Sequence, residues 1–303
     1  MYDVTIVGAG PAGASAALLL ARARRRVLVL DTGEGRNSAS RGVHLLLSRE
    51  GSEPARLRRE SWEQLSPYPD LDTRRIAAVT AAGERDGFEV TLADGDVVAS
   101  RRLLLATGVR DLLPPVDGLA EHWGRSAFLC PYCDGWEARD QAMGTLITDA
   151  ESLHFADRLL RWSGDLSAFR HGAFAIPGEQ RDRLRAAGLT VYDSPVARVR
   201  GVEGRMKEVV LADGTVVACS ALFVHPETEQ RSGLARELGC TVLEDDSVEI
   251  DFANATSVPG VYAAGDMART AYQPTPIAYV AAAATSGLVA ATFIDTDLYG
   301  STG

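Results

Sequence analysis

Short apolar runs and one helical stretch alternate at the start of the chain. The runs Tyr2–Val7 and Val27–Leu30 are predicted as strands of a buried sheet. Between them, Ala14–Ala23 consists of small and apolar residues and is predicted as a helix that ends in a cluster of arginines. A strand, a glycine-rich turn, a helix and a second strand in this order are typical of a parallel α/β unit.

Later segments continue the same alternation. Strands are predicted in Arg102–Gly108 and in Thr256–Asp266, each ending on a glycine-containing turn. A helix is predicted from about Pro276 to Ala291, because proline suits a first helical turn. In the middle of the chain, residues 142–160 have a strand–turn–helix pattern, and the helix Glu151–Trp162 is expected to place Leu153, Leu159 and Leu160 against a sheet.

Charge and composition exclude several classes of partner. The 303 residues include 41 acidic and 31 basic ones, a net charge of −10 at pH 7, whereas a nucleic-acid partner needs a basic face. No run approaches about 18 consecutive apolar residues, the length of a membrane span. No targeting leader is recognisable before the first strand. A cytoplasmic protein without nucleic-acid or membrane partners is therefore expected.

The glycine-rich turn after the first strand has the G-x-G-x-x-G spacing of a dinucleotide site. Gly8 allows the tight turn, Gly10 lets a pyrophosphate approach the backbone, and Gly13 lets the helix pack on the strand. Free N–H groups at the helix start attract the anion. Asp31, at the end of the second strand, has the spacing for ribose hydroxyls. The motif alone leaves NAD or FAD open.

Cys130 and Cys133 form a Cys-x-x-Cys motif at a predicted helix start. Backbone N–H groups there lower the pKa of one thiol and make it reactive. Cys219 and Cys240 are isolated and are predicted as core residues, and no histidine pair has zinc spacing, so no metal site is expected. A redox-active dithiol is the preferred interpretation over a metal site or a structural disulfide.

Three fingerprints together resemble the two-dinucleotide-domain flavoproteins: the glycine loop, the Ala-Thr-Gly strand end and the terminal Gly-Asp. With Cys-x-x-Cys-Asp-Gly between them, the chain resembles low-molecular-weight thioredoxin reductases over nearly its whole length. That resemblance implies an α/β fold of two Rossmann-like, three-layer domains, the second inserted into the first. The FAD domain would span 1–113 and 221–303, and the cysteine-bearing domain 114–220. The implied FAD contacts are Gly8, Gly10, Ala12, Gly13, Asp31, Arg36, Asn37, Thr107, Gly108, Gly265, Asp266 and Ile277.

The resemblance also implies roles around the cysteine pair. Cys133 would face the flavin and Cys130 would exchange with substrate. Asp134 would be the acid–base of the dithiol, although a helix-start residue that binds backbone N–H groups is an open alternative. His44 is expected either to line the substrate pocket or to be a buried structural histidine. Related flavoproteins are homodimers, and a homodimer is expected here.

The inserted domain departs from the reductases where they bind NADPH. Ile147, Thr148 and Asp149 replace the glycine triplet, and Asp149 and Glu151 add negative charge beside the pyrophosphate position. A His-Arg-Arg cluster for the 2′-phosphate is reduced to Arg170 and its neighbour His171. NADPH binding is therefore not expected, and the pattern resembles the FAD-dependent dithiol oxidases that close disulfides in natural products of the holomycin and gliotoxin kind.

The expected enzyme oxidises a small dithiol through the cysteine pair, reduces FAD and passes the electrons to O2, giving H2O2. Two alternatives remain open from the sequence. One is a thioredoxin-type disulfide reductase supplied by ferredoxin or another donor, with a thioredoxin-like protein as partner. The other is a flavin-bearing redox sensor without turnover. The sequence does not identify the dithiol.

Overall fold

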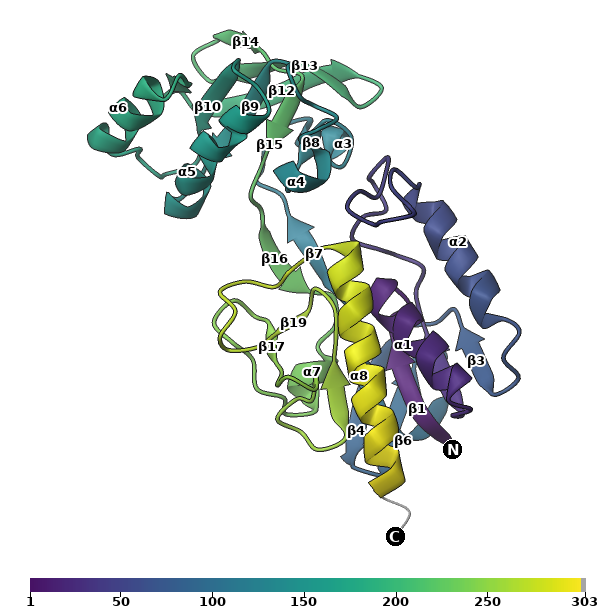
Figure 1. Cartoon of the computed structure of the whole chain (residues 1–303). Helices are drawn as coiled ribbons and strands as arrows, with labels where there is room; N and C mark the ends of the chain where they lie inside the picture. Colours follow the sequence, from purple (N-terminus) through teal and green to yellow (C-terminus); the bar gives the residue numbers. More distant parts are fainter. Residues whose placement is uncertain (301–303) are drawn as a thin grey trace. The chain divides into compact units, whose positions relative to one another are not determined.

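Residues 1–300 are described by a computed structural model, which divides into two compact units. Unit 1 comprises Met1–Arg36, Pro54–Arg110 and the chain from Thr228 onward, and unit 2 comprises Asn37–Glu53 and Asp111–Glu227 (Figure 1). The chain therefore passes from one unit to the other four times. At two of these passages it runs through the paired strands β7 (Val109–Leu112) and β16 (Glu227–Gln230).

Unit 1 is built on a seven-stranded sheet of order β3-β2-β1-β6-β5-β4, with β18 paired to β6. Strands β1, β2, β3, β6 and β18 are parallel, and β4, β5 and β6 form an antiparallel meander. The central strands read as continuous apolar runs because both faces of the parallel part are buried. Their bounds are β1 Tyr2–Val7, β2 Val27–Leu30, β3 Leu71–Arg74, β4 Ala78–Glu84, β5 Gly87–Leu92, β6 Val97–Leu105 and β18 Val261–Ala263.

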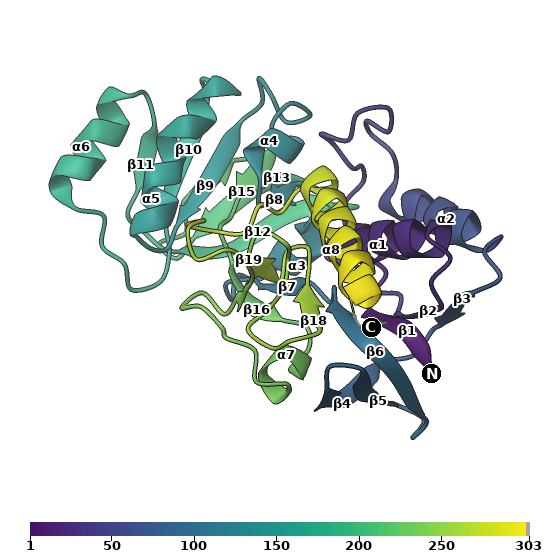
Figure 2. The ribbon, with the colours of Figure 1, turned by 60° about the horizontal axis from the view of Figure 1, so that its bottom comes forward.

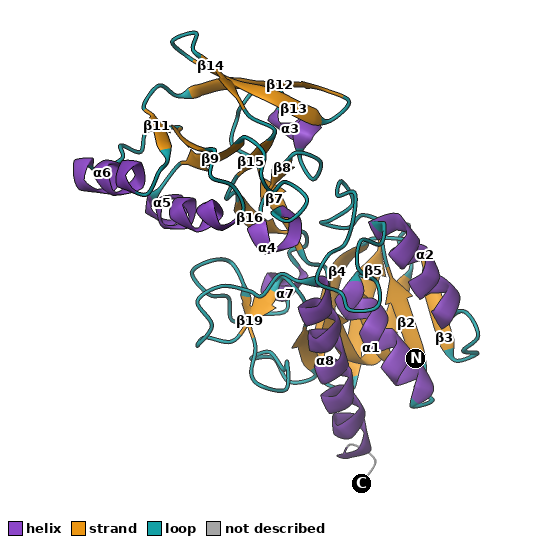
Figure 3. Ribbon diagram, turned by 45° about the horizontal axis from the view of Figure 1, so that its top comes forward, coloured by secondary structure: helices purple, strands orange, loops and turns teal. Residues whose placement is uncertain are grey.

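Two long helices, α1 (Pro11–Arg22) and α8 (Val280–Gly300), run side by side along this sheet (Figures 1 and 3). Small residues permit their close approach: a Cβ on Gly287 would lie 2.0 Å from the carbonyl oxygen of Ala12. Any side chain at position 287 would therefore separate the helices. The remaining elements of the unit are α2 Pro54–Leu65, α7 Leu234–Glu237 and the paired strands β17 Val248–Glu249 and β19 Ala268–Arg269.

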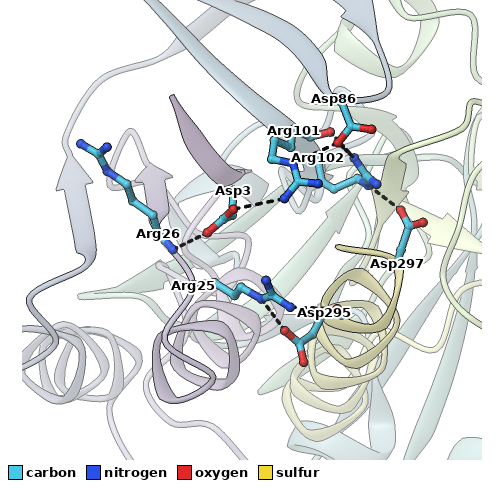
Figure 4. A network of polar contacts seen from close by, with 8 residues as sticks. All are labelled: Asp3, Arg25, Arg26, Asp86, Arg101, Arg102, Asp295 and Asp297. Carbon is cyan, nitrogen blue, oxygen red and sulfur yellow. Dashed lines mark hydrogen bonds and ion pairs between the residues drawn. The ribbon is translucent and has the colours of Figure 1, made fainter. Parts of the chain in front are cut away.

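A buried arginine ties the end of α8 to the sheet. Arg102, on β6, is fully buried and donates hydrogen bonds to Asp297 of α8 and, at 2.8 Å, to Asp86 of the turn between β4 and β5 (Figure 4). The guanidinium of Arg102 holds the pKa of Asp86 below its usual range. Arg101 bonds the same carboxylate at 3.0 Å, so the charges form a network rather than a single pair.

Unit 2 has a five-stranded sheet of order β11-β10-β9-β15-β8, in which all pairings are parallel. Helices α5 and α6 lie along strands β9 to β11 (Figure 2). The sheet strands are β8 Ala127–Phe128, β9 Met143–Ile147, β10 Leu166–Arg170, β11 Thr190–Tyr192 and β15 Ala221–Phe223. A three-stranded antiparallel sheet is formed by β12 Val196–Val202, β13 Arg205–Leu211 and β14 Val216–Ala218. The helices are α3 Leu119–His122, α4 Pro131–Asp134, α5 Ala150–Ala156 and α6 Gly178–Ala186.

The boundaries between the two units differ from those predicted from the sequence. The predicted second segment of the FAD domain began at 221, but Ala221–Phe223 forms β15, paired in parallel with β9 and β8 of unit 2. Asn37–Glu53, expected within the FAD domain, groups with unit 2. Unit 2 is thus assembled from two stretches of chain, not from one insertion.

Two predicted helices have other bounds. Helix α8 begins at Val280, not at Pro276, and residues 276–279 lie in the loop before it. The helix predicted for 151–162 is α5 followed by the 3-10 helix Asp157–Arg161. The buried positions of Leu153 and Leu159 agree with the predicted apolar face.

We expect Asp297→Ala to lower the free energy of unfolding by about 2–3 kcal/mol, because the buried Arg102 guanidinium loses a charged partner. Denaturant titration of the purified variants measures this change. The matched control is Glu229→Ala, which removes the partner of the exposed Arg110 and should cost less than about 1 kcal/mol. Equal losses in the two variants would contradict an anchoring role for Arg102.

Candidate active site

The glycine loop lies between β1 and α1 in unit 1. Gly8 has φ +104°, as the predicted tight turn requires, and a Cβ on Gly13 would lie 1.8 Å from the carbonyl oxygen of Gly8. At Gly10, by contrast, a Cβ would meet no atom within 4 Å. No side chain caps α1, so its first turn faces open space with its backbone N–H groups. The loop can therefore receive a phosphate group at Gly10.

Asp31 closes this loop from the end of β2. Its carboxylate is buried and accepts hydrogen bonds from the backbone N–H groups of Ala9 and Gly33, both at 3.0 Å. A carboxylate has about four acceptor sites, so two remain for ribose hydroxyls. Asp31 thus shapes the loop as well as providing the predicted acceptor.

A second group of predicted contacts converges from distant parts of unit 1. Arg36 donates to the Asp266 carboxylate at 3.0 Å, and both side chains are about four-fifths buried. The backbone N–H of Gly265 donates to the Ser286 hydroxyl of α8 at 3.2 Å. The Thr107 hydroxyl contacts the Met267 sulfur at 3.3 Å. These contacts fix the strand ends that carry the Ala-Thr-Gly and Gly-Asp motifs.

Four other predicted contacts lie in different surroundings. The Ala12 side chain is buried, and the Cβ position of Gly265 lies 3.1 Å from its Cβ, so only its backbone can serve a ligand. Ile277 is 55% exposed in the loop before α8, not in the first turn of that helix. Asn37 begins the segment that belongs to unit 2. Gly108, with φ +66°, accepts a hydrogen bond from Arg231 through its carbonyl.

The loop, the acid and the second strand end together fit an FAD molecule. An open position at Gly10 suits the pyrophosphate, and Asp31 suits the adenosine ribose. Asp266, held by Arg36, is available at the Gly-Asp strand end that the flavoprotein resemblance assigns to FAD.

The cysteine pair lies in unit 2 at the start of α4. Cys130 and Cys133 are joined as a disulfide with their Cα atoms 5.3 Å apart. Cys130 is the N-terminal cap of α4, and its sulfur accepts a hydrogen bond from the Cys133 backbone N–H at 3.2 Å. That donor would stabilise a Cys130 thiolate once the disulfide is reduced. Cys219 and Cys240 are buried and free, as predicted for core residues.

Acidic and basic side chains interact with Asp134, the residue that follows Cys133. Burial raises the pKa of Asp134 to about 6, while His44 lowers it and Glu137 raises it further. A carboxyl with a pKa near the working pH can both take and return a proton, which suits the predicted acid–base role. The His44 ring nitrogen Nδ1 lies 2.6 Å from Glu50 and 3.8 Å from Glu137. His44 is therefore part of a charged cluster, not an isolated core histidine.

Sequence reasoning missed Glu50 and Glu137. Glu137 lies four residues after Cys133, and Ala138 N–H donates to the Asp134 carbonyl at 3.2 Å, so helical spacing offered a signal for it. Glu50 offered none, because it reaches His44 through a loop. Among the described residues, no group of three or more His, Cys, Asp or Glu side chains could hold a metal ion.

The predicted degenerate turn of unit 2 lies between β9 and α5. The Asp149 carboxylate accepts from the Ser152 backbone N–H at 2.8 Å, and the Ser152 hydroxyl accepts from the N–H groups of Thr148 and Asp149 at 3.0 and 3.1 Å. Partial burial by itself raises the pKa of Asp149, but the hydrogen bonds from Ser152 act in the opposite direction. The pKa of Asp149 therefore lies below its usual value. The side chain of Glu151 lies outside the described residues.

A dinucleotide-binding unit joined to a second unit with a Cys-x-x-Cys disulfide beside a carboxyl of raised pKa is typical of a flavin-dependent disulfide oxidoreductase. The sequence profile described as pyridine nucleotide-disulphide oxidoreductase matches residues 2–149 and 175–285. The chain belongs to this family, within which it is similar to the thioredoxin reductases, and like them it is an FAD-binding oxidoreductase.

Individual relatives support that placement. A probable thioredoxin reductase of Arthroderma benhamiae is 31% identical over 297 residues, which cover 88% of this chain and 74% of the relative. Thioredoxin reductase sirT of Leptosphaeria maculans is 31% identical over 286 residues, with coverage of 88% and 87%. The crystal structure of HlmI matches with a TM-score of 0.90 and 37% identity over 99% of this chain and 93% of that one.

The fold itself is also found in a putative thioredoxin reductase TrxB from Bacillus anthracis, with a TM-score of 0.92, 27% identity and 100% coverage of both chains. The predicted fold class, family resemblance and cofactor are thereby confirmed. In residues 1–300, no helix has both the length and the apolar character needed to cross a bilayer.

We expect Gly10→Ala and Gly13→Ala to fail in different ways. A methyl group at position 10 has room in the protein itself but occupies the open side of the loop, so FAD content should fall while thermal stability stays close to wild type. A methyl group at position 13 meets the Gly8 carbonyl and should lower stability directly. Flavin absorbance per polypeptide and thermal unfolding measure the two effects.

Gly164→Ala is the control, because a Cβ there also meets no atom within 4 Å and lies far along the chain from the loop. Full FAD content in the Gly10→Ala variant would contradict the placement of the phosphate.

Proposed function

We propose that the protein is an FAD-dependent dithiol oxidase, which forms a disulfide in a small dithiol through Cys130 and Cys133 and uses O2 as the final electron acceptor. The observation that carries the proposal is the self-capped turn at Thr148–Asp149 in the unit that bears the disulfide. Without a hydride donor bound there, the cysteine pair is the electron entry that the proposal assigns.

The turn is unsuited to a pyrophosphate for two reasons. Dinucleotides bind to free N–H groups at a helix start, but Asp149 and Ser152 form a reciprocal capping box that uses them. The Asp149 carboxylate also remains ionised, because the hydrogen bonds from Ser152 lower its pKa. A pyrophosphate would therefore meet an anion and find the N–H groups of Thr148, Asp149 and Ser152 already paired.

The second element expected for NADPH is likewise engaged. Arg170 donates to the backbone carbonyls of Asp193 at 2.7 Å and Gly172 at 2.8 Å. Burial lowers the pKa of the neighbouring His171, so its imidazole is neutral at pH 7. His171 therefore offers no positive charge to a 2′-phosphate, and the Arg170 guanidinium is directed toward backbone carbonyls.

The chemistry of the cysteine pair then runs toward substrate oxidation. A substrate thiolate attacks the Cys130 sulfur, which breaks the Cys130–Cys133 bond and forms a mixed disulfide. The second substrate thiolate then attacks the substrate sulfur of the mixed disulfide. This step releases the oxidised product and leaves Cys130 and Cys133 reduced. Asp134, with a pKa of about 6, accepts protons from the thiols in these steps.

FAD, when bound, takes the two electrons of the reduced cysteines and passes them to O2, so that one dithiol and one O2 give one disulfide and one H2O2. Gly10, Asp31 and Asp266 would hold it. The 37% identity with HlmI, and the sequence resemblance to dithiol oxidases of the holomycin and gliotoxin kind, support a natural-product dithiol as substrate.

A thioredoxin-type disulfide reductase is the second candidate. It is favoured by the 31% identity with relatives that are named thioredoxin reductases. With the unit 2 turn capped, it would need ferredoxin or another donor in place of NADPH. A thioredoxin-like protein would then be the partner, and a homodimer is the assembly we predict in either case.

We expect anaerobic NADPH or NADH to leave the flavin absorbance unchanged, because Asp149 and Ser152 block the nucleotide turn. A small dithiol should bleach the flavin, and air should then restore it with one equivalent of peroxide. Rapid bleaching by NADPH would return the protein to the NADPH-dependent reductases. Bleaching by reduced ferredoxin but not by dithiols would favour the second candidate.

We expect Cys130→Ser and Cys133→Ser each to abolish dithiol oxidation, because neither single cysteine can form the internal disulfide. Oxygen uptake with a dithiol measures turnover, and thermal unfolding checks that the fold is kept. Cys240→Ala is the matched control, since this buried free cysteine should be dispensable for turnover. Full activity in either serine variant would show that the pair is not the electron relay.

A further inference from the structure

The loop that carries His44 is fixed at its base. Val43 and Ser52 pair across it, with the Val43 N–H donating to the Ser52 carbonyl at 2.8 Å and the Gly51 N–H donating to the Val43 carbonyl at 2.9 Å. Glu50 connects two points of the loop. One of its carboxylate oxygens contacts His44 Nδ1, and the other accepts a hydrogen bond from the Leu45 N–H at 2.9 Å. These contacts hold His44 in one place.

The loop keeps an unfavourable backbone conformation next to this histidine. Leu45 and Ser48 have φ values of +61° and +71°, in the left-handed region. Such a residue costs on the order of 1–3 kcal/mol, and such costs gather at functional sites. The left-handed turn at Leu45 directly follows His44 and brings the Leu45 N–H to the same carboxylate that holds the imidazole. The strained backbone at Leu45 thus helps to place the Glu50 carboxylate that orients His44.

His44 lies among the acidic groups of the cysteine motif. Its Nδ1 is 3.8 Å from Glu137, and it interacts electrostatically with Asp134. Glu50 from the loop and Glu137 from the turn after α4 are charged groups that interact with His44, and Glu137 also acts on Asp134. The His44 side chain is only 16% exposed, so solvent screens the interaction between His44 and Asp134 less than it screens a surface ion pair.

We propose that His44, oriented by Glu50, is a positioning residue that keeps Asp134 able to accept thiol protons by placing a positive charge beside it, and that Glu137 opposes this effect. The inference rests on the proposed acid–base use of Asp134 in dithiol oxidation. It assigns a function to the excursion Asn37–Glu53, which brings a histidine from between β2 and α2 into the cysteine-bearing unit.

The signs of the two effects are opposite and can be tested separately. Protonated His44 favours the ionised form of Asp134 and lowers its pKa, whereas Glu137 disfavours that form and raises it. His44→Gln should therefore raise the pKa of Asp134, and Glu137→Gln should lower it. A merely structural role for either side chain gives no reason for shifts in opposite directions.

The experiment follows the rate at which iodoacetamide alkylates the reduced holoprotein, as a function of pH. In the wild type the profile should have an inflection near pH 6 from Asp134, which Asp134→Asn removes. His44→Gln should move this inflection to higher pH and Glu137→Gln to lower pH. His154→Gln, at an exposed histidine of α5, is the matched control and should leave the profile unchanged.

Three results would overturn the proposal: an inflection that Asp134→Asn leaves in place, one that neither variant moves, or shifts of both variants in the same direction. If His44→Gln does not fold, the half-exposed Glu137 still gives its own test, because an upward or absent shift in Glu137→Gln contradicts the scheme. Alkylation needs neither a dithiol substrate nor O2. Opposite shifts without dithiol oxidation would therefore keep the role of His44 and reject only the oxidase.

Discussion

Unit 1 depends on a close backbone contact that leaves no room for side chains. The N-terminal turn of α1 touches the Gly8 carbonyl through Gly13 and touches α8 through Gly287. These contacts set the position of the loop relative to both β1 and the long C-terminal helix. Because α8 is held at its other end by Arg102 and Asp297, the first and last segments of the chain determine together where the loop opens. The space at Gly10 is what this arrangement leaves for a ligand.

The two units use acidic residues at chain turns in opposite ways. Asp31 accepts a hydrogen bond from the Ala9 N–H of the glycine loop and leaves the start of α1 without a side-chain cap. Asp149 occupies the start of α5 itself and shares its donors with Ser152. One helix start carries no side-chain cap and the other is capped, although both follow a buried parallel strand. In the proposed function, this difference between two similar turns decides where electrons enter the protein.

Local motifs made much of unit 1 predictable, because the strands β1 and β2, the glycine loop and Asp31 lie within the first 31 residues. Long-range interactions were not predictable in the same way. Arg102 and Asp297 are 195 residues apart, and nothing near either one indicates a buried ion pair. The start of α8 was misplaced because Pro276 was taken as a first helical residue, whereas the helix begins four residues later at Val280.

The excursion Asn37–Glu53 limits how this protein can be taken apart or recombined. A gene fragment for residues 111–227 would encode the cysteine pair and Asp134 but not His44 or its loop. Modular exchange with a related enzyme would therefore need two pieces transferred together, and a chimera built from one piece would combine the cysteines of one parent with the histidine of the other.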